Sequence, residues 1–413
     1  MISAFRGLPL ATLFILMTVV IDSIGIGIML PVIPLLISEV GGTTLAGAAF
    51  WGGILASGYA LMQFVFSPIL GNLSDRFGRR PVLLISLAVM ALHYILLAVA
   101  TSVWVLLFAR IIGGMTGATM AVALAYMADT TPAERRGANF GLVSACFGLG
   151  FTLGPLIGGW LGAIDPRLPF YAAAAAATAN VLLGWLAAPE SLKPEARRAF
   201  DWRRANPVGG LMQMSRLPGA YGLLAALLLY QIATMVYPSV WAYFTPVQFG
   251  WDVRVVSLSL TIFGLSMFLV QSGLARMVFE RIGESRAVLY GLMINVTCLI
   301  CYGLTPYAWS IWALLPLSAL GALVAPALQS LISQSAADDQ QGEVQGVISS
   351  IAAIAMIISP FTMTRIFGYF TAEDAQIFLP GAPFLAASLM MFACLAVVAL
   401  RGGPKLGQGQ AQA

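Results

Sequence analysis

Residues Gly71–Leu84, GNLSDRFGRRPVLL, form a charged turn between two long apolar runs. The runs cover residues 51–70 and 82–99, and each is long enough to cross a bilayer as a helix of roughly 20 residues. A charged turn between two spanning helices cannot enter the hydrocarbon, so it marks one face of a membrane. The residues that we assign to this turn are Gly71, Asp75, Arg76, Gly78, Arg79 and Arg80.

The composition indicates a membrane protein. Of the 413 residues, 60% are apolar and 9% are charged, whereas a soluble domain carries roughly 25% charged residues. The apolar runs are continuous and do not alternate with polar residues, which favours helices over a β-barrel. The sequence has no basic face with interleaved aromatic residues, so we expect no nucleic-acid partner.

The sequence predicts an all-α membrane protein with twelve transmembrane helices in two pseudo-symmetric halves of six. The halves are residues 1–189 and 219–402, joined by a cytoplasmic linker, 190–218, and followed by a flexible tail, 403–413. The predicted spans are approximately residues 10–37, 46–70, 82–101, 103–127, 139–161, 168–188, 219–243, 254–279, 286–303, 306–332, 343–370 and 378–400.

Lysine and arginine are distributed unevenly between the two sets of loops. Seventeen of the 21 lie in the tails or in loops on the same side as the charged turn, and only Arg167 and Arg254 lie in the opposite loops. Positively charged loops remain in the cytoplasm. Because an even number of spans returns the chain to its starting side, we predict that both termini and the charged turn are cytoplasmic.

The two halves repeat each other at an offset of 205 residues. The matching pairs are Asp75-Arg76-x-Gly78 with Glu280-Arg281-x-Gly283, Gly137 and Gly141 with Gly342 and Gly346, and Pro155 with Pro360. Three anchors at one offset indicate a duplicated unit of six helices. This architecture is typical of a large class of transporters with the solute site between the halves.

Two charged residues lie deep in the predicted spans, where charges are costly and mark functional candidates. Asp22 is the only carboxylate well inside a span, and because burial disfavours its charged form, we expect it to bind a proton. Alternatively, Asp22 is a structural acid bonded to a backbone amide or to Arg110. Arg110 needs an acceptor: it tunes proton affinity, contacts an anionic solute, or forms a salt bridge that fixes helix packing.

Other polar residues in the spans are weaker candidates. His93, the only histidine, is either a proton relay or, as we favour, a satisfied core residue. The amide side chains either line a solute path or form interhelical hydrogen bonds, the commoner use. They are Gln63, Gln231, Gln271, Asn295 and Gln329.

The fifth predicted span combines small residues with a proline, which permits bending and close helix contact. The pattern is Gly150, Gly154, Pro155, Gly158 and Gly159.

The sequence offers no support for an enzyme or a metal site. Cys298 and Cys301 have CxxC spacing without a second pair, so we expect packing and no metal. We find no nucleophile with a base, no phosphate-binding loop and no ATPase cassette, so we expect no catalytic activity and no cofactor. Transport would then be driven by an ion gradient, with the proton as coupling ion, or would follow the concentration gradient of the substrate.

The turn sequence GNLSDRFGRRP resembles the loop motif of the major facilitator superfamily, and the glycine pattern of the fifth span resembles that of its drug:proton antiporters. Over nearly its full length, the chain is similar to bacterial tetracycline/proton antiporters. The stretches that carry this likeness are Asp22-x-x-Gly25-Ile26-Gly27, Tyr59-Ala60-Leu61-Met62-Gln63, Ala128-Asp129-Thr130-Thr131, Phe249-Gly250-Trp251 and Pro326-Ala327-Leu328-Gln329.

The resemblance implies roles for individual residues. Asp22 and Gln63 match positions of the solute and proton pathway. Asp75 would pair with the cytoplasmic end of the eleventh span to close an inner gate, which its counterpart at Glu280-Arg281 would mirror. Within this gate, Arg76 and Arg80 would brace Asp75, and Asp129 would be a charge partner.

Three positions depart from the tetracycline exporters. The exporters have an acid in span three where this chain has His93, a histidine in span eight where it has Met267, and an acid in span nine where it has Asn295. These positions are tied to drug recognition or coupling in the family. Proton coupling would therefore depend on Asp22 more heavily here.

We predict a secondary transporter of the bacterial inner membrane that exports a small amphipathic molecule, such as a tetracycline, in exchange for protons by alternating access. It would be a monomer, with the substrate, protons and the lipid bilayer as its partners. One alternative is a proton-linked metabolite importer or facilitator on the same fold. Another is a membrane protein that binds a ligand without transporting it.

Overall fold

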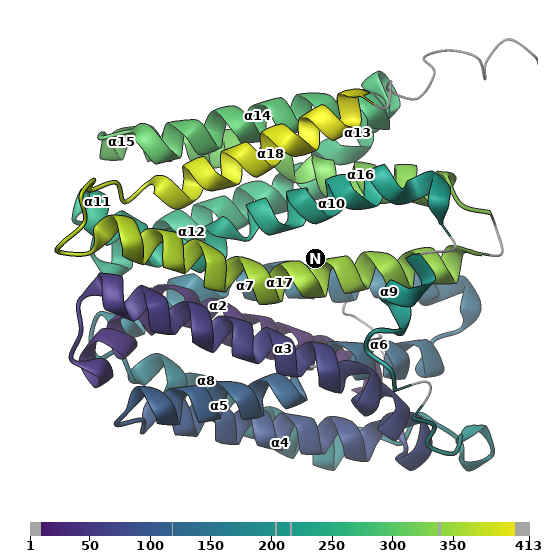
Figure 1. Cartoon of the computed structure of the whole chain (residues 1–413). Coiled ribbons are helices and arrows are strands. Elements are labelled where there is room, and N and C mark those ends of the chain that lie inside the picture. Colours follow the sequence, from purple (N-terminus) through teal and green to yellow (C-terminus); the bar gives the residue numbers. More distant parts are fainter. Residues whose placement is uncertain (1–9, 118, 203–204, 215–216, 338–339, 401–413) are drawn as a thin grey trace, which may run out of the picture. The chain divides into compact units, whose positions relative to one another are not determined.

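The computed structural model describes residues 10–117, 119–202, 205–214, 217–337 and 340–400. Within these ranges the chain is built from helices joined by short loops (Figure 1). Twelve helical segments are long and apolar enough to cross a membrane, which confirms the predicted number. They are Leu10–Gly41, Leu45–Phe77, Arg79–Ala98, Val103–Thr130, Arg136–Gly162, Leu168–Ala187, Tyr221–Phe249, Val253–Ile282, Glu284–Leu304, Ala308–Gln334, Gln341–Thr371 and Ala382–Leu400.

The described chain separates into two compact units. The first comprises the residues up to Pro207 together with Trp251–Thr261, and the second comprises Val208–Gly250 and the residues from Ile262 onward. The predicted halves, 1–189 and 219–402, stay a prediction, and the predicted tail lies outside the described residues.

In the first unit, α2 packs against α7, α3 against α5, and α4 against α8. The core between α2, α4 and the fourth span is largely aliphatic and includes Phe14, Leu83, Leu87 and Tyr126. The helices of this unit are α2 (Leu10–Gly41), α3 (Leu45–Phe77), α4 (Arg79–Ala98), α5 (Val103–Thr116), α6 (Thr119–Thr130), α7 (Arg136–Gly162), α8 (Leu168–Ala187) and the beginning of α12 (Val253–Leu269).

In the second unit, α18 packs against both α10 and α14. Its core contains an aromatic cluster in which Trp241 lies edge-on to Tyr302 and Phe384. The helices are α9 (Gly209–Gln213), α10 (Tyr221–Thr234), α11 (Val236–Phe249), the end of α12, α13 (Ala275–Ile282), α14 (Glu284–Leu304), α15 (Ala308–Ala319), α16 (Val324–Gln334), α17 (Gln341–Thr371) and α18 (Ala382–Leu400).

The backbone of the two charged turns supports the internal repeat. Gly78 ends α3 and begins α4 with φ 103° and ψ 156°. Gly283, 205 residues later, ends α13 and begins α14 with φ 79° and ψ 161°. Only glycine adopts such angles without strain, so the same residue at both places gives the same sharp turn.

Two spans of the second unit contain turns that are not α-helical. The eighth span has a π-helical turn at Val270–Leu274, and the tenth has a 3₁₀ turn at Leu320–Leu323. Val270 and Leu323 belong to one small apolar cluster, so these two irregular turns pack against each other. π-turns within α-helices occur frequently at functional sites.

Candidate functional site

The first unit gathers polar side chains from α2, α3, α4 and α5. We call them the polar cluster: Asp22, Tyr59, Gln63, His93, Tyr94 and Arg110. Asp22 lies half-buried on α2, and the hydroxyl of Tyr94 lies against Gly25, one turn further along the same helix. The centre of the His93 ring lies 5.1 Å from that of Tyr94 and 6.5 Å from that of Tyr59.

Arg110 is 9% exposed and has unusual neighbours for a buried cation. Its guanidinium carbon lies 4.0 Å from the centre of the Tyr59 ring, and Nη1 lies 3.4 Å from the sulfur of Met29. Among the described residues it forms no salt bridge, with Asp22 or with any other acid. The structure therefore favours neither the packing salt bridge nor the Asp22–Arg110 bond that the sequence left open.

His93 is completely buried on α4 and only partly satisfied. Its Nδ1 lies 2.7 Å from the carbonyl oxygen of Ala109, which can only accept, so Nδ1 carries the proton. Nε2 is then an acceptor, and within the described part of the chain it has no partner. One ring nitrogen of His93 is thus satisfied, and both its core role and its proton-relay role stay predictions.

Glycines on α5 and just after it allow the cluster to assemble. A Cβ atom at Gly113 would stand 2.7 Å from Nδ1 of His93, and one at Gly114 would collide with the backbone of Tyr59. Gln63 Nε2 donates to the carbonyl oxygen of Gly117 at 2.9 Å. Sequence reasoning singled out Gln63 but missed Tyr59, which lies about one helical turn earlier on α3.

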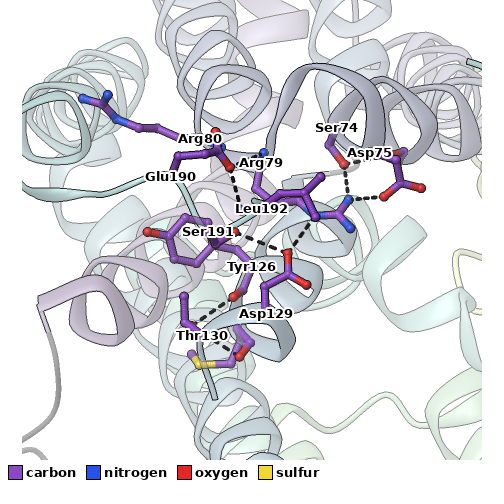
Figure 2. A network of polar contacts seen from close by, with 12 residues as sticks. Ser74, Asp75, Arg79, Arg80, Tyr126, Asp129, Thr130, Glu190, Ser191 and Leu192 are labelled. Carbon is purple, nitrogen blue, oxygen red and sulfur yellow. Dashed lines mark hydrogen bonds and ion pairs between the residues drawn. The ribbon is translucent and has the colours of Figure 1, made fainter. Parts of the chain in front are cut away.

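The charged turn is held by an arginine that bridges two acids (Figure 2). Arg79 Nη1 lies 2.6 Å from Asp75 Oδ1, and Arg79 Nε lies 3.1 Å from Asp129 Oδ2 at the end of α6. In this structure the cation beside Asp75 and Asp129 is thus Arg79, and the bracing role of Arg76 and Arg80 stays a prediction. Arg79 has the reach because it starts the helix that follows the turn, whereas Arg76 lies over the ring of Phe77.

The same turn is tied to the beginning of the predicted linker. Glu190 accepts hydrogen bonds from the backbone amides of Arg79, at 2.8 Å, and Arg80, at 3.3 Å. These are free N–H groups at the start of α4, where a negative charge is favoured. Arg80 Nη2 donates to the carbonyl oxygen of Trp185 at 2.6 Å, so this side chain fastens α4 to α8 (Figure 2).

The counterpart turn in the second unit is built differently. Glu280 pairs with Arg276 at 2.7 Å within its own helix. The following acid, Glu284, reaches the tenth span by accepting from Ser330 Oγ at 2.7 Å and Gln334 Nε2 at 2.9 Å. Glu284 therefore links this turn to the tenth span. The gating role of Glu280-Arg281 stays a prediction. The predicted bond between Asp75 and the eleventh span joins the two units and stays a prediction.

The glycine pattern of α7 places that helix directly against α2. Ideal Cβ atoms at Gly150, Gly154 and Gly158 would stand 2.6 Å from the Val20 carbonyl oxygen, the Gly27 Cα and the Ile28 carbonyl oxygen. The fourth glycine of the pattern, Gly159, faces the Ser257 side chain at the start of α12 instead. Close helix contact explains the glycines that the sequence singled out.

Replacing Gly154 with alanine is expected to destabilise the protein by about 1–3 kcal/mol, because the two backbones would have to separate. Gly141 on the same helix has no atom within 4 Å of an added Cβ. Gly141→Ala is the matched control and should be neutral or slightly stabilising, since alanine favours helices by about 1 kcal/mol. Thermal denaturation of the purified variants measures both effects, and equal stability of the two would contradict the contact.

The predicted polar residues of the second unit have separate surroundings. Asn295 is buried, and its Nδ2 donates to the carbonyl oxygen of Gly321 at 3.3 Å, which also accepts from Tyr230 at 2.9 Å. This interhelical bond is the commoner use of a span amide. Gln271 lies exposed in the π-turn, and Met267 packs against the apolar cluster that contains Val270 of this turn. Gln231 and Gln329 are partly exposed. Their roles in substrate binding stay predictions.

Among the described residues, no group of three or more histidine, cysteine, aspartate or glutamate side chains has an arrangement that would hold a metal ion. Within the polar cluster, Asp22 can bind a proton or a cation, Arg110 can bind an anion, and the rings of Tyr59 and Tyr94 can contact an aromatic group.

Comparisons with known proteins agree with this architecture. A model of the Major Facilitator Superfamily matches residues 15–360. The chain is 37% identical to "Tetracycline resistance protein, class C" of Escherichia coli, over 86% of this chain and 89% of that protein. It is 34% identical to the class H protein of Pasteurella multocida over 92% and 94%. A solved structure of the nucleoside transporter NupG has a TM-score of 0.73 at 12% identity, covering 94% of this chain and 98% of that one.

Proposed function

Since the chain belongs to the major facilitator superfamily, we propose that it is a proton-coupled antiporter that exports a small amphipathic drug-like molecule such as a tetracycline. The observation that carries this proposal is the similarity to tetracycline resistance proteins at 33–37% identity over 85–92% of the chain. Such coverage includes both sets of six spans, so the similarity is not limited to a shared motif.

The proton-binding residue in this proposal is Asp22. It is the only acid of the polar cluster, it is half-buried, and no described residue forms a salt bridge with it. A buried carboxylate without a counter-ion is costly, and a proton removes that cost. Gain and loss of the proton change the charge of the cluster by one unit and so bias the inward-facing and outward-facing states differently.

The remaining features belong to the same proposal. The transporter acts as a monomer in the bacterial inner membrane with both termini in the cytoplasm, since most lysines and arginines lie on that side. Two halves, residues 1–189 and 219–402, alternate between states around linker 190–218. The proton is the coupling ion, and no further cofactor takes part.

The proposal is tested by tetracycline uptake into inverted membrane vesicles that contain the protein. A vesicle interior more acidic than the medium should drive accumulation, because each entering substrate exchanges for a leaving proton. Collapse of the gradient with a protonophore should abolish it. Accumulation driven by an alkaline interior would instead assign symport, and the absence of flux in either direction would contradict transport.

A further inference from the structure

The first half of the linker is bound to the end of the first unit at a defined depth. Asn72 Nδ2 donates to the carbonyl oxygen of Asp201 at 2.6 Å. The backbone amide of Arg198 donates to the carbonyl oxygen of Asp75 at 3.1 Å. Asn72 lies two residues beyond the apolar run 51–70 of α3, which is about 3 Å past the end of that run along the helix axis. The headgroup layer on each side of the hydrocarbon is roughly 5–8 Å thick, so Asp201 is held at headgroup depth.

The beginning of the same segment is fixed as well (Figure 2). Glu190 accepts from the backbone amides of Arg79 and Arg80, and Leu192, two residues later, is only 8% exposed. We call residues 190–202 the linker strap; all of them belong to the first unit. Because the strap is held at both of its ends, its exposed side chains stay at the end of this unit.

The linker strap exposes a tryptophan. Trp202 is 73% exposed, although its ring packs edge-on against Phe200 with the ring centres 4.9 Å apart. A second exposed ring, that of Phe77, belongs to the charged turn to which the strap is bound. Tryptophan is enriched where a membrane meets water, because its ring is apolar and its N–H needs a polar partner. An exposed tryptophan at headgroup depth therefore indicates contact with lipid.

The charges beside this tryptophan are positive and available. Arg197 and Arg198 are exposed, and within the described part of the chain neither forms an ion pair. Lys193 and Glu195, which are also exposed, offset each other, whereas Arg76 on the adjoining turn adds a further exposed cation. The headgroups of anionic phospholipids attract such basic segments at a membrane surface. The charge of the strap therefore complements an anionic lipid layer.

We propose that the linker strap is a binding surface for anionic phospholipids, with headgroup phosphates on Arg197 and Arg198 and the ring of Trp202 between headgroups and acyl chains. Arginine suits this role because its planar fork matches a phosphate group. RNA would meet the same charges, but the depth at which the strap is bound favours lipid. The contact would fix to the bilayer the segment that joins the two units, whatever solute the protein carries.

The test follows a fluorescent label on the strap of the full-length protein. The label is attached to Ala199→Cys, because Ala199 is exposed and lies next to the arginines. Cys301→Ser is added, since the other three cysteines are buried. The protein is placed in nanodiscs of phosphatidylcholine alone, or of phosphatidylcholine and phosphatidylglycerol in equal parts. Quenching by acrylamide, which is uncharged, gives the ratio of lipid-protected to water-exposed label.

Each arginine near an anionic surface contributes a factor of about five to this ratio. We expect phosphatidylglycerol to raise the ratio, and Arg197→Gln/Arg198→Gln to lower it about 25-fold in those discs but not in phosphatidylcholine. Arg197→Lys/Arg198→Lys keeps the charge and should keep most of the ratio. Trp202→Ser should lower the ratio about tenfold in both lipids, because burial of the ring does not depend on headgroup charge.

Arg276→Gln/Arg286→Gln is the matched control, because it removes two exposed arginines at the counterpart turn of the second unit. It should leave the ratio unchanged. The proposal is overturned if phosphatidylglycerol does not raise the ratio, or if the control lowers it as much as Arg197→Gln/Arg198→Gln does. Protection of the label in phosphatidylcholine discs by inorganic phosphate or by a short RNA would assign the arginines to a soluble anion and would also overturn it.

Discussion

Replacing Asp22 with asparagine is expected to abolish pH-driven accumulation of substrate while leaving the protein folded. The two side chains have nearly the same shape, but the amide of asparagine does not gain or lose a proton near neutral pH. For one proton exchanged per substrate, a gradient of one pH unit supports about tenfold accumulation, since each step of about 1.4 kcal/mol corresponds to a factor of ten. In the variant the ratio of internal to external substrate should fall to about one.

Inverted vesicles with an imposed pH gradient provide the measurement. Asp374→Asn is the matched control, because Asp374 is an exposed acid in the loop between α17 and α18. It should retain wild-type accumulation. Substrate counterflow without a gradient then separates lost coupling from lost binding. Full tenfold accumulation by Asp22→Asn would remove Asp22 from the proton pathway.

The fold was predictable because the bilayer imposes strong rules on sequence. Each span needs a continuous apolar run, so the number of spans could be counted, and the described part of the chain contains the same twelve. Helix ends were less predictable, since α3 continues to Phe77 as a polar extension beyond its apolar run. The irregular turns at Val270–Leu274 and Leu320–Leu323 also escaped prediction, because apolar composition does not distinguish them from α-helix.

The candidate site was predictable where a residue is costly in a membrane, and less so elsewhere. Asp22 and Arg110 stood out because charges in spans are rare. Tyr59 and Met29 did not, although both contact Arg110, because such residues are common in any span. Sequence also could not decide which arginine of the charged turn reaches Asp129. That choice depends on where Gly78 ends one helix and starts the next.

The linker illustrates the same limit. Its composition predicts a polar connection, yet its first half is fixed to the first unit: Asn72 Nδ2 donates to the carbonyl oxygen of Asp201 at 2.6 Å. Its short helix α9 packs instead against α17, where Gly210 lies beside Gly346. These contacts join residues more than 100 positions apart, and local pattern carries no signal for them.

Arg79→Gln is expected to be the most damaging substitution in the charged turn. It removes the cation shared by Asp75 and Asp129 and leaves two carboxylates near each other without compensation. Breaking a buried ion pair costs about 3–5 kcal/mol. Because the side chains of Asp75 and Asp129 are 38% and 26% exposed, solvent reduces that penalty, and we expect a loss of about 2 kcal/mol in stability.

Arg76→Gln is the control, since Arg76 belongs to the same turn but lies over Phe77, and its cost should be within about 0.5 kcal/mol. Thermal denaturation at two ionic strengths distinguishes repulsion from lost packing. The Debye length falls from about 8 Å at 0.15 M to about 3 Å at 1 M, so salt should reduce the deficit of Arg79→Gln. Adding Asp129→Asn to Arg79→Gln should restore part of the stability, because only one carboxylate then remains. A larger loss in Arg76→Gln, or no recovery in the double variant, would show that Arg79 does not bridge the two acids.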